Sequence, residues 1–133
     1  MSDDASARLG LPYLAAGQLQ KHVTLNEALT RLDALIQTAV VSRTAAEQPA
    51  DPVEGALYIL PEAATGADWA THPAGRLLRH ERGGWLPVPA PDGLLAVVLD
   101  SEEILVRRAG VWTPLSFGLQ QEIQQITRLG VNA

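Results

Sequence analysis

The 133-residue chain contains no cysteine, which excludes disulfide bonds and thiolate metal sites and is consistent with synthesis in a reducing cytoplasm. It also has no apolar run that approaches the roughly 18 residues of a membrane-spanning helix. Residues 1–10 lack the basic and then apolar pattern of a signal peptide. These absences predict a protein that is soluble when made and that neither spans a membrane nor is exported.

Basic residues are also few. Ten Lys and Arg against fifteen Asp and Glu give a formal net charge of −5. Non-specific binding to nucleic acid requires clustered basic side chains that contact phosphates. Nucleic acid is therefore not expected as a partner.

The chain shows no recognisable catalytic or metal-binding pattern. His22, His72 and His80 are scattered, whereas a helical metal pair needs two histidines four residues apart. No Gly-x-Ser-x-Gly nucleophile motif is present. The carboxylates at 100, 102 and 103 fit a solvated turn better than a glycosidase pair. We expect no enzymatic activity, no metal and no cofactor.

Residues 11–29 join a polar and apolar arm to a helix start. Thr24 and Glu27 have the spacing of a capping box, with Val23 placed to pack against Ala28. An apolar stripe at three- and four-residue steps then predicts an amphipathic helix over 25–40. The stripe consists of Leu25, Ala28, Leu29, Leu32, Ile36 and Val40, and the opposite, polar face of Asn26, Thr30, Arg31, Asp33 and Gln37.

Glycine and proline punctuate residues 49–93 and forbid long helices there. The short runs between the breaks predict strands over 56–60, 76–80, 85–88, 94–99, 104–108 and 111–115. Residues 94–99 are apolar without alternation, which is typical of a strand buried on both faces. Residues 76–87 and 103–114 share one plan of strand, Gly turn, Trp, one residue and Pro. They predict two similar β-hairpins.

Residues 116–129 predict a second helix, because Leu119, Ile123, Ile126 and Leu129 are spaced by four, three and three. Gly130 is a suitable terminator. This helix could pack on its own sheet or form a short bundle between subunits, and the pattern does not choose between them.

The three tryptophans have two interpretations. Trp69, Trp85 and Trp112 could stack on a glycan, or they could fill the protein core. Because Trp is highly buried on average, the core is favoured. Trp69, in the loop 66–72, is expected to be the most exposed of them.

The arm residues also have two interpretations. Tyr13, Gln18, Lys21 and His22, with Gln20, could satisfy local backbone groups, or they could contact a neighbouring subunit. We favour the second, because an apolar, uncharged arm is costly to expose to water.

The run from Leu11 to Leu35, followed by a Gly-rich β segment with paired Trp residues, resembles a family of domains of unknown function. The similarity extends over about residues 9–115, and the first block is the more specific. The resemblance implies a structural role in tailed-phage, prophage or gene-transfer-agent particles of alphaproteobacteria, at a spike or fibre that meets the recipient cell. A short chain most resembles the base piece that fastens a head spike to a capsid.

We therefore expect an α+β chain with a flexible N-terminus over 1–10, a docking arm plus long helix over 11–48, a small antiparallel β domain over 49–115 and a C-terminal helix and tail over 116–133. The expected function is an oligomeric adaptor at the base of a head spike or fibre. Its partners would be further copies of itself in a five-fold or three-fold ring, a capsid vertex protein and the spike or fibre protein. The alternative is a carbohydrate-binding module for surface polysaccharide.

Overall fold

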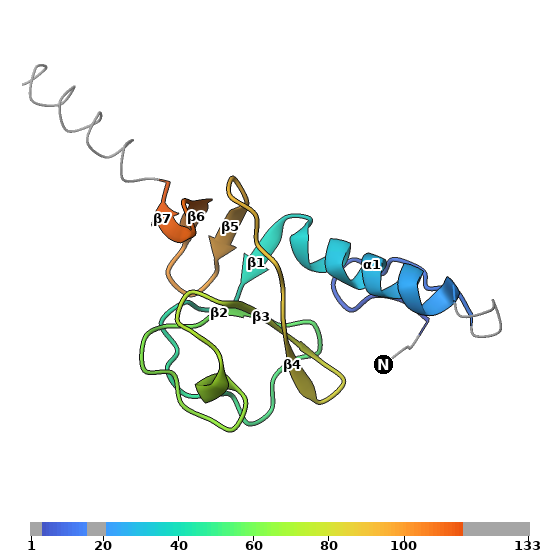
Figure 1. Ribbon diagram of the computed structural model, residues 1–133, viewed down its shortest axis with the longest axis horizontal. Coiled ribbons are helices and arrows are strands. Elements are labelled where there is room, and N and C mark those ends of the chain that lie inside the picture. Colours follow the sequence, from blue (N-terminus) through green and yellow to red (C-terminus); the bar gives the residue numbers. More distant parts are fainter. Residues whose placement is uncertain (1–3, 16–20, 116–133) are drawn as a thin grey trace, which may run out of the picture.

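The computed structural model describes residues 4–15 and 21–115, with the side chains of residues 21 and 22 not placed (Figure 1). The predicted C-terminal helix therefore lies outside the described residues, and so does Gln18. The elements in chain order are α1 (Lys21–Leu35), β1 (Thr38–Val40), β2 (Leu57–Ile59), the 3-10 helix η1 (Trp69–Thr71), β3 (Leu77–Glu81), β4 (Gly84–Pro87), β5 (Leu95–Val98), β6 (Glu103–Arg108) and β7 (Val111–Pro114).

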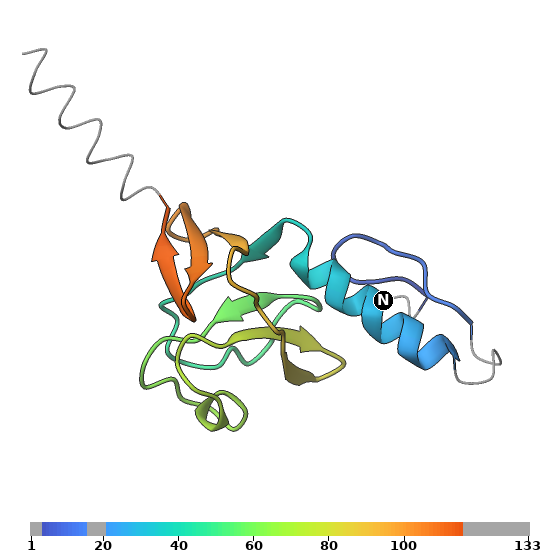
Figure 2. The same ribbon diagram turned by 45° about the horizontal axis from the view of Figure 1, so that its top comes forward.

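The strands form two sheets. One has four strands in the order β1-β5-β6-β7, and the other has three in the order β2-β3-β4. β1 runs parallel to β5, and every other pair of neighbouring strands is antiparallel. Figure 2 shows the two sheets beside one another, with α1 projecting from the β1 end of the larger sheet.

The expected α+β class, with an N-terminal arm and a long helix, is wrong. The described residues are mostly β, with a single 15-residue α-helix. Residues 4–10, expected to be flexible, instead pack along α1, where Ser6 is buried.

The boundaries of α1 also differ from the predicted ones. The helix begins at Lys21, so Thr24 lies within it and is not its cap. It ends at Leu35, where Gln37 takes a positive φ of 47° and the Thr38 hydroxyl donates to the Ala34 carbonyl. Val40, predicted to continue the helical stripe, lies in β1. The β-branched side chains that follow favour a strand over a further helical turn.

The two hairpins predicted from the repeated pattern are confirmed. In β3–β4 the turn residues Arg82 and Gly83 have positive φ, and in β6–β7 Ala109 and Gly110 do so. Two successive positive φ values match the right-handed twist of the flanking strands. The registers correspond as well, since Trp85 lies opposite His80 and Trp112 opposite Arg107.

The core has two parts, one on each face of the three-stranded sheet. Between the two sheets lie the buried side chains of Ala34, Val40, Leu57, Ile59, Leu77, Val88, Ala96, Val98, Leu105 and Trp112. On the other face, Leu60, Trp69, Leu78 and Trp85 form a second cluster. β3 thus contributes to both clusters, through Leu77 and Leu78.

Replacing Leu105 by alanine should lower the free energy of unfolding by about 2–5 kcal/mol, because it leaves a cavity between the sheets. Leu105 is fully buried, whereas Leu86 is 51% exposed. The same change at Leu86 should alter stability by no more than about 0.5 kcal/mol. Urea denaturation of both variants measures the difference, and equal losses would contradict the assignment of the core.

Candidate docking surfaces

The carboxylate of Asp33 on α1 is the centre of a buried polar network. It accepts hydrogen bonds from the Ser6 hydroxyl at 2.5 Å, from the backbone N–H of Arg8 at 3.1 Å and from that of Leu9 at 2.6 Å. A fourth bond, at 2.7 Å, comes from Nη1 of Arg79 on β3. The side chain of Asp33 is 0% exposed and that of Arg79 is 2% exposed. This carboxylate therefore joins the N-terminal segment (residues 4–15), the helix and the three-stranded sheet.

Arg8, which lies in the same N-terminal segment, caps the C-terminal end of α1. Its guanidinium donates to the carbonyl oxygens of Asp33, Ala34, Ile36 and Gln37. The first two are carbonyls of the last helical turn, which a helix C-terminus leaves without intrahelical donors, and the other two follow the end of α1 at Leu35. Burial lowers the pKa of Arg8, an effect that the neighbouring Asp33 opposes. A cation at this end also complements the helix dipole.

Further along, the N-terminal segment is held to the polar face of α1 by side chains of the helix. The Asn26 side chain accepts from the N–H of Leu14 and donates to its carbonyl, at 2.9 and 3.0 Å. The Tyr13 hydroxyl lies 2.6 Å from that of Thr30. Asn26, Thr30 and Asp33 of the predicted polar face thus contact the chain itself, whereas Arg31 and Gln37 of that face are exposed.

The predicted apolar stripe lies on the outside instead. Leu25, Leu32 and Ile36 are 44–48% exposed, and Leu29 is partly buried. Their positions, at about 100° per residue, place them on the side of α1 opposite Glu27 and Arg31. The side chains of this helix that pack inward onto the N-terminal segment are instead polar ones, those of Asn26, Thr30 and Asp33.

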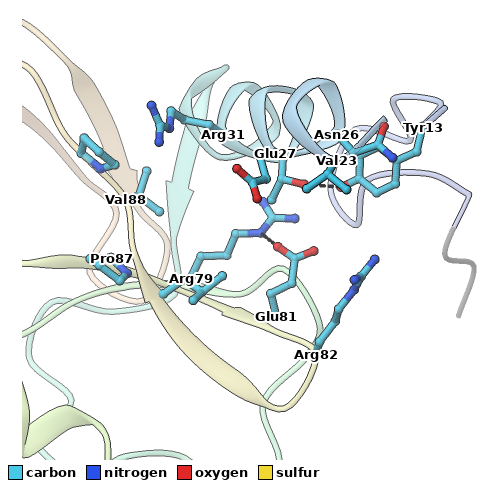
Figure 3. Close-up of a pocket in the computed structure, with 13 residues that line it drawn as sticks. Tyr13, Val23, Asn26, Glu27, Arg31, Arg79, Glu81, Arg82, Pro87 and Val88 are labelled. Carbon is cyan, nitrogen blue, oxygen red and sulfur yellow. Dashed lines mark hydrogen bonds and ion pairs between the residues drawn. The ribbon is translucent and has the colours of Figure 1, made fainter. Parts of the chain in front are cut away.

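Glu27 and Arg31 line a groove of about 570 Å³ between α1 and the β3–β4 hairpin. Figure 3 shows that it receives Tyr13 from the N-terminal segment and Arg79 from β3. Its other walls are partly apolar and consist of Val23, Leu86, Pro87, Val88 and Pro89. Inside it, Nε of Arg79 donates to Glu81 at 3.0 Å, so the buried guanidinium is already paired with two carboxylates.

The residues predicted to contact another subunit or a partner differ in how far the structure describes them. Tyr13 lines this groove, and its hydroxyl bonds to the side-chain hydroxyl of Thr30, so its predicted contact with a neighbouring subunit stays a prediction. Lys21 and His22 begin α1, and the positions of their side chains are not described. Gln18, Gln20, Leu119, Ile123, Ile126 and Leu129 all lie outside the described residues.

The three tryptophans are all buried, and the expectation that Trp69 is exposed is wrong, since it is 0% exposed. Its ring packs 5.1 Å from Tyr58 and 5.3 Å from Trp85, centroid to centroid, in tilted and edge-on arrangements. Trp112 donates from its indole nitrogen to the Gly75 carbonyl at 2.9 Å, and Arg107 lies over its ring. A glycan could not stack on these faces without displacing core contacts.

The described residues contain no group of three or more His, Asp or Glu side chains placed to hold a metal ion. They also include no helix with the length and apolar character needed to cross a membrane. The carboxylate of Glu103, predicted to sit in a solvated turn, binds Arg43 at 2.7 and 2.9 Å. Its pKa is lowered by the hydrogen bond from Arg43 and by a second one from Ser101.

No role was predicted for Ser6, Arg8 or Arg79, although these residues position the helix. A signal was present at Arg79, which in the predicted strand over 76–80 lies on the same face as Leu77. A charged residue at a buried strand position requires a buried partner. Nothing in the sequence identified Asp33 as that partner.

Replacing Asp33 by alanine should lower the free energy of unfolding by about 3–5 kcal/mol, because the buried Arg79 guanidinium loses a charged partner. The matched control is Glu103→Ala, which breaks a half-exposed ion pair with Arg43 and should cost no more than about 1 kcal/mol. Urea unfolding curves test the comparison. A loss at Asp33 as small as that at Glu103 would show that the network does not stabilise the fold.

Acid should destabilise the wild type more than Asp33→Asn. Hydrogen bonds from Ser6, Arg79, Leu9 and Arg8 outweigh burial and hold the pKa of Asp33 below its ordinary value of 3.8. Its contribution is therefore complete above about pH 4 and is lost as the pH falls through the lower folded value. Unfolding free energies measured from pH 6 to pH 2 should fall more steeply for the wild type, and parallel curves would contradict this.

Comparison with known proteins identifies a family but no activity. The model of a protein family of unknown function, DUF2793, matches residues 25–113, which include α1 from Leu25 onward and nearly all of both sheets. No curated protein matches the chain. The matched region covers more than half of the sequence, and the chain therefore belongs to the DUF2793 family of proteins of unknown function.

Proposed function

We propose that this protein is a structural component of a phage-like particle, an oligomeric adaptor at the base of a head spike or fibre. The observation that carries the proposal is the orientation of α1. The helix turns its polar face inward, onto the N-terminal segment, and leaves Leu25, Leu32 and Ile36 exposed.

This orientation is unusual for a helix that serves only its own fold. A surface helix ordinarily buries its apolar stripe and exposes its polar face. Here the helix is held by charge-assisted hydrogen bonds to Asp33 and by the Arg8 cap at its C-terminus. A helix fixed in this way presents a rigid apolar edge to another molecule at little further cost in conformational entropy.

The proposed particle and the proposed partners are inferred from the family resemblance over residues 9–115. It points to a capsid vertex protein on one side and to a spike or fibre protein on the other. A vertex position would favour a five-fold ring, and a fibre position a three-fold one. Attachment to the recipient cell would then be mediated through the spike or fibre.

The alternative, a carbohydrate-binding module, has less support. Stacking on sugars requires accessible aromatic faces, and Trp69, Trp85 and Trp112 are each no more than 8% exposed. Trp69→Ala should therefore unfold the second core cluster, and it should not remove glycan binding selectively.

The adaptor proposal predicts that Leu25→Gln with Leu32→Gln removes the chain from particles. Two apolar anchors at an interface are worth about 2–4 kcal/mol, so the number of copies per particle should fall at least about tenfold. Quantitative mass spectrometry of particles purified from cells that express each variant gives this number.

Thr24→Gln, an exposed change on the same helix outside the apolar stripe, is the control and should leave the copy number unchanged. Thermal unfolding of the purified variants should match the wild type, because the changed side chains are exposed. Normal incorporation of the double variant, or absence of the wild-type chain from purified particles, would overturn the proposal.

A further inference from the structure

The four-stranded sheet has an outward apolar face that nothing in the described chain covers. Its inward side chains, such as Val98 and Leu105, belong to the core between the sheets. An antiparallel sheet with one face in water normally carries polar residues on that face. Here six large apolar side chains on or beside the outward face are 40–60% exposed, namely Leu95, Val97, Leu99, Ile104, Val111 and Leu115.

The strand register sets these side chains side by side. Val97 on β5 lies opposite Ile104 on β6. The N–H of Leu115 donates to the carbonyl of Ile104, which continues the same row past the end of β7. Because β7 is an edge strand, the chain leaves the sheet at Leu115, directly beside this apolar row.

The dimensions of this face match those of a single helix. β5 and β7 are two strand spacings apart, which is about 10 Å, and a helix with its side chains is about 10–12 Å wide. β6 lies between them, and its six residues extend over about 20 Å. A helix laid along β6 would therefore contact side chains of all three strands.

The same dimensions are small for a contact between two copies of the chain. Three strands of this length present roughly 300 Å² of flat surface. A stable protein–protein interface buries about 800 Å² on each partner. The face therefore suits a segment that is already attached to the molecule better than a second copy.

The residues directly after Leu115 have the length and the pattern that this face requires. The apolar stripe of the predicted helix runs from Leu119 to Leu129, a rise of about 15 Å, which is within the length of β6. The three residues 116–118 would join strand and helix, and connections of two to six residues are usual there. The other side of the predicted helix is polar and suits contact with water, with Gln120, Gln121, Glu122, Gln124, Gln125 and Arg128.

We propose that residues 116–129 dock on the outward face of the four-stranded sheet of their own chain, with Leu119, Ile123, Ile126 and Leu129 against β5, β6 and β7. A short tether gives such a segment an effective concentration in the millimolar range. It therefore covers the face in preference to a second copy at ordinary protein concentrations. β5 is then buried on both faces, which agrees with its apolar sequence without alternation.

This inference goes beyond the proposed adaptor and does not rest on it. It assigns the apolar side chains of residues 116–129 to the fold of their own chain and leaves the apolar stripe of α1 for a partner. The experiment below uses the purified chain alone, so absence of the protein from particles would leave this inference intact.

The test is thiol labelling of the purified full-length chain, which has no cysteine of its own. Val97→Cys places one thiol on the face. Leu86→Cys, on β4 of the other sheet at a position 51% exposed, is the matched control. The rate of reaction with a maleimide, divided by the rate in urea, is measured at about 1 μM and about 100 μM protein, both well below the local concentration of a tethered segment.

Val97→Cys should react at least about tenfold more slowly than Leu86→Cys at both concentrations, because a covered thiol reacts only when the segment opens. Adding Ile123→Lys should bring the two rates to within about twofold of each other, because a lysine is not buried without a partner. The rate of Leu86→Cys should not change on adding Ile123→Lys. If it rises because the fold is lost, Ile123→Ala takes the place of Ile123→Lys.

Three results would overturn the inference. Equal rates for the two thiols would show that the face is open to solvent. Protection of Val97→Cys that appears only at the higher concentration would assign the face to a second copy. Protection that survives the change at Ile123 in a folded variant would show that residues 116–129 are not what covers it.

Discussion

The buried pair of Asp33 and Arg79 is the interaction on which the arrangement of this molecule depends. Asp33 has no exposed surface, and its carboxylate accepts hydrogen bonds from four donors, three in the N-terminal segment and one in β3. Removing either charge would leave the other buried with fewer partners, Arg79 with Glu81 alone and Asp33 with its uncharged donors, which costs several kcal/mol. The donors lie on one side of the helix and form directional hydrogen bonds with Asp33. The network therefore holds α1 in place and also sets which side of the helix faces inward.

The inward orientation of the polar side of α1 decides which surfaces of the molecule remain exposed. An amphipathic helix has one face to bury, and here the polar face is buried by the N-terminal segment (Figure 1). The apolar stripe and the outward face of the four-stranded sheet are then both left without cover from the described chain. Two apolar surfaces on one small molecule are therefore available for contacts beyond the described residues.

Prediction from sequence succeeded where local chemistry decides the structure. Both hairpins were found from their Gly turns and Trp-x-Pro ends, since two positive φ values restrict a turn strongly. It failed where long-range contacts decide. The end of α1 depends on Arg8, which is distant in sequence, and the burial of Trp69 depends on Tyr58 and Trp85 packing around it. No local pattern contains that information.

The amino-acid sequence by itself determined most of the elements, namely one amphipathic helix, the short strands between glycine and proline breaks, and two hairpins of one design, but not β1, which was predicted as the end of the helix. Only the tertiary structure decided that these hairpins lie in different sheets, that β1 pairs in parallel with β5, and that the helix packs by its polar side. The physical reason is that the periodicity of the sequence identifies an apolar and a polar face of the helix, but it does not show which of the two faces packs inward. The direction was decided by the partner available to a single buried charge, Arg79.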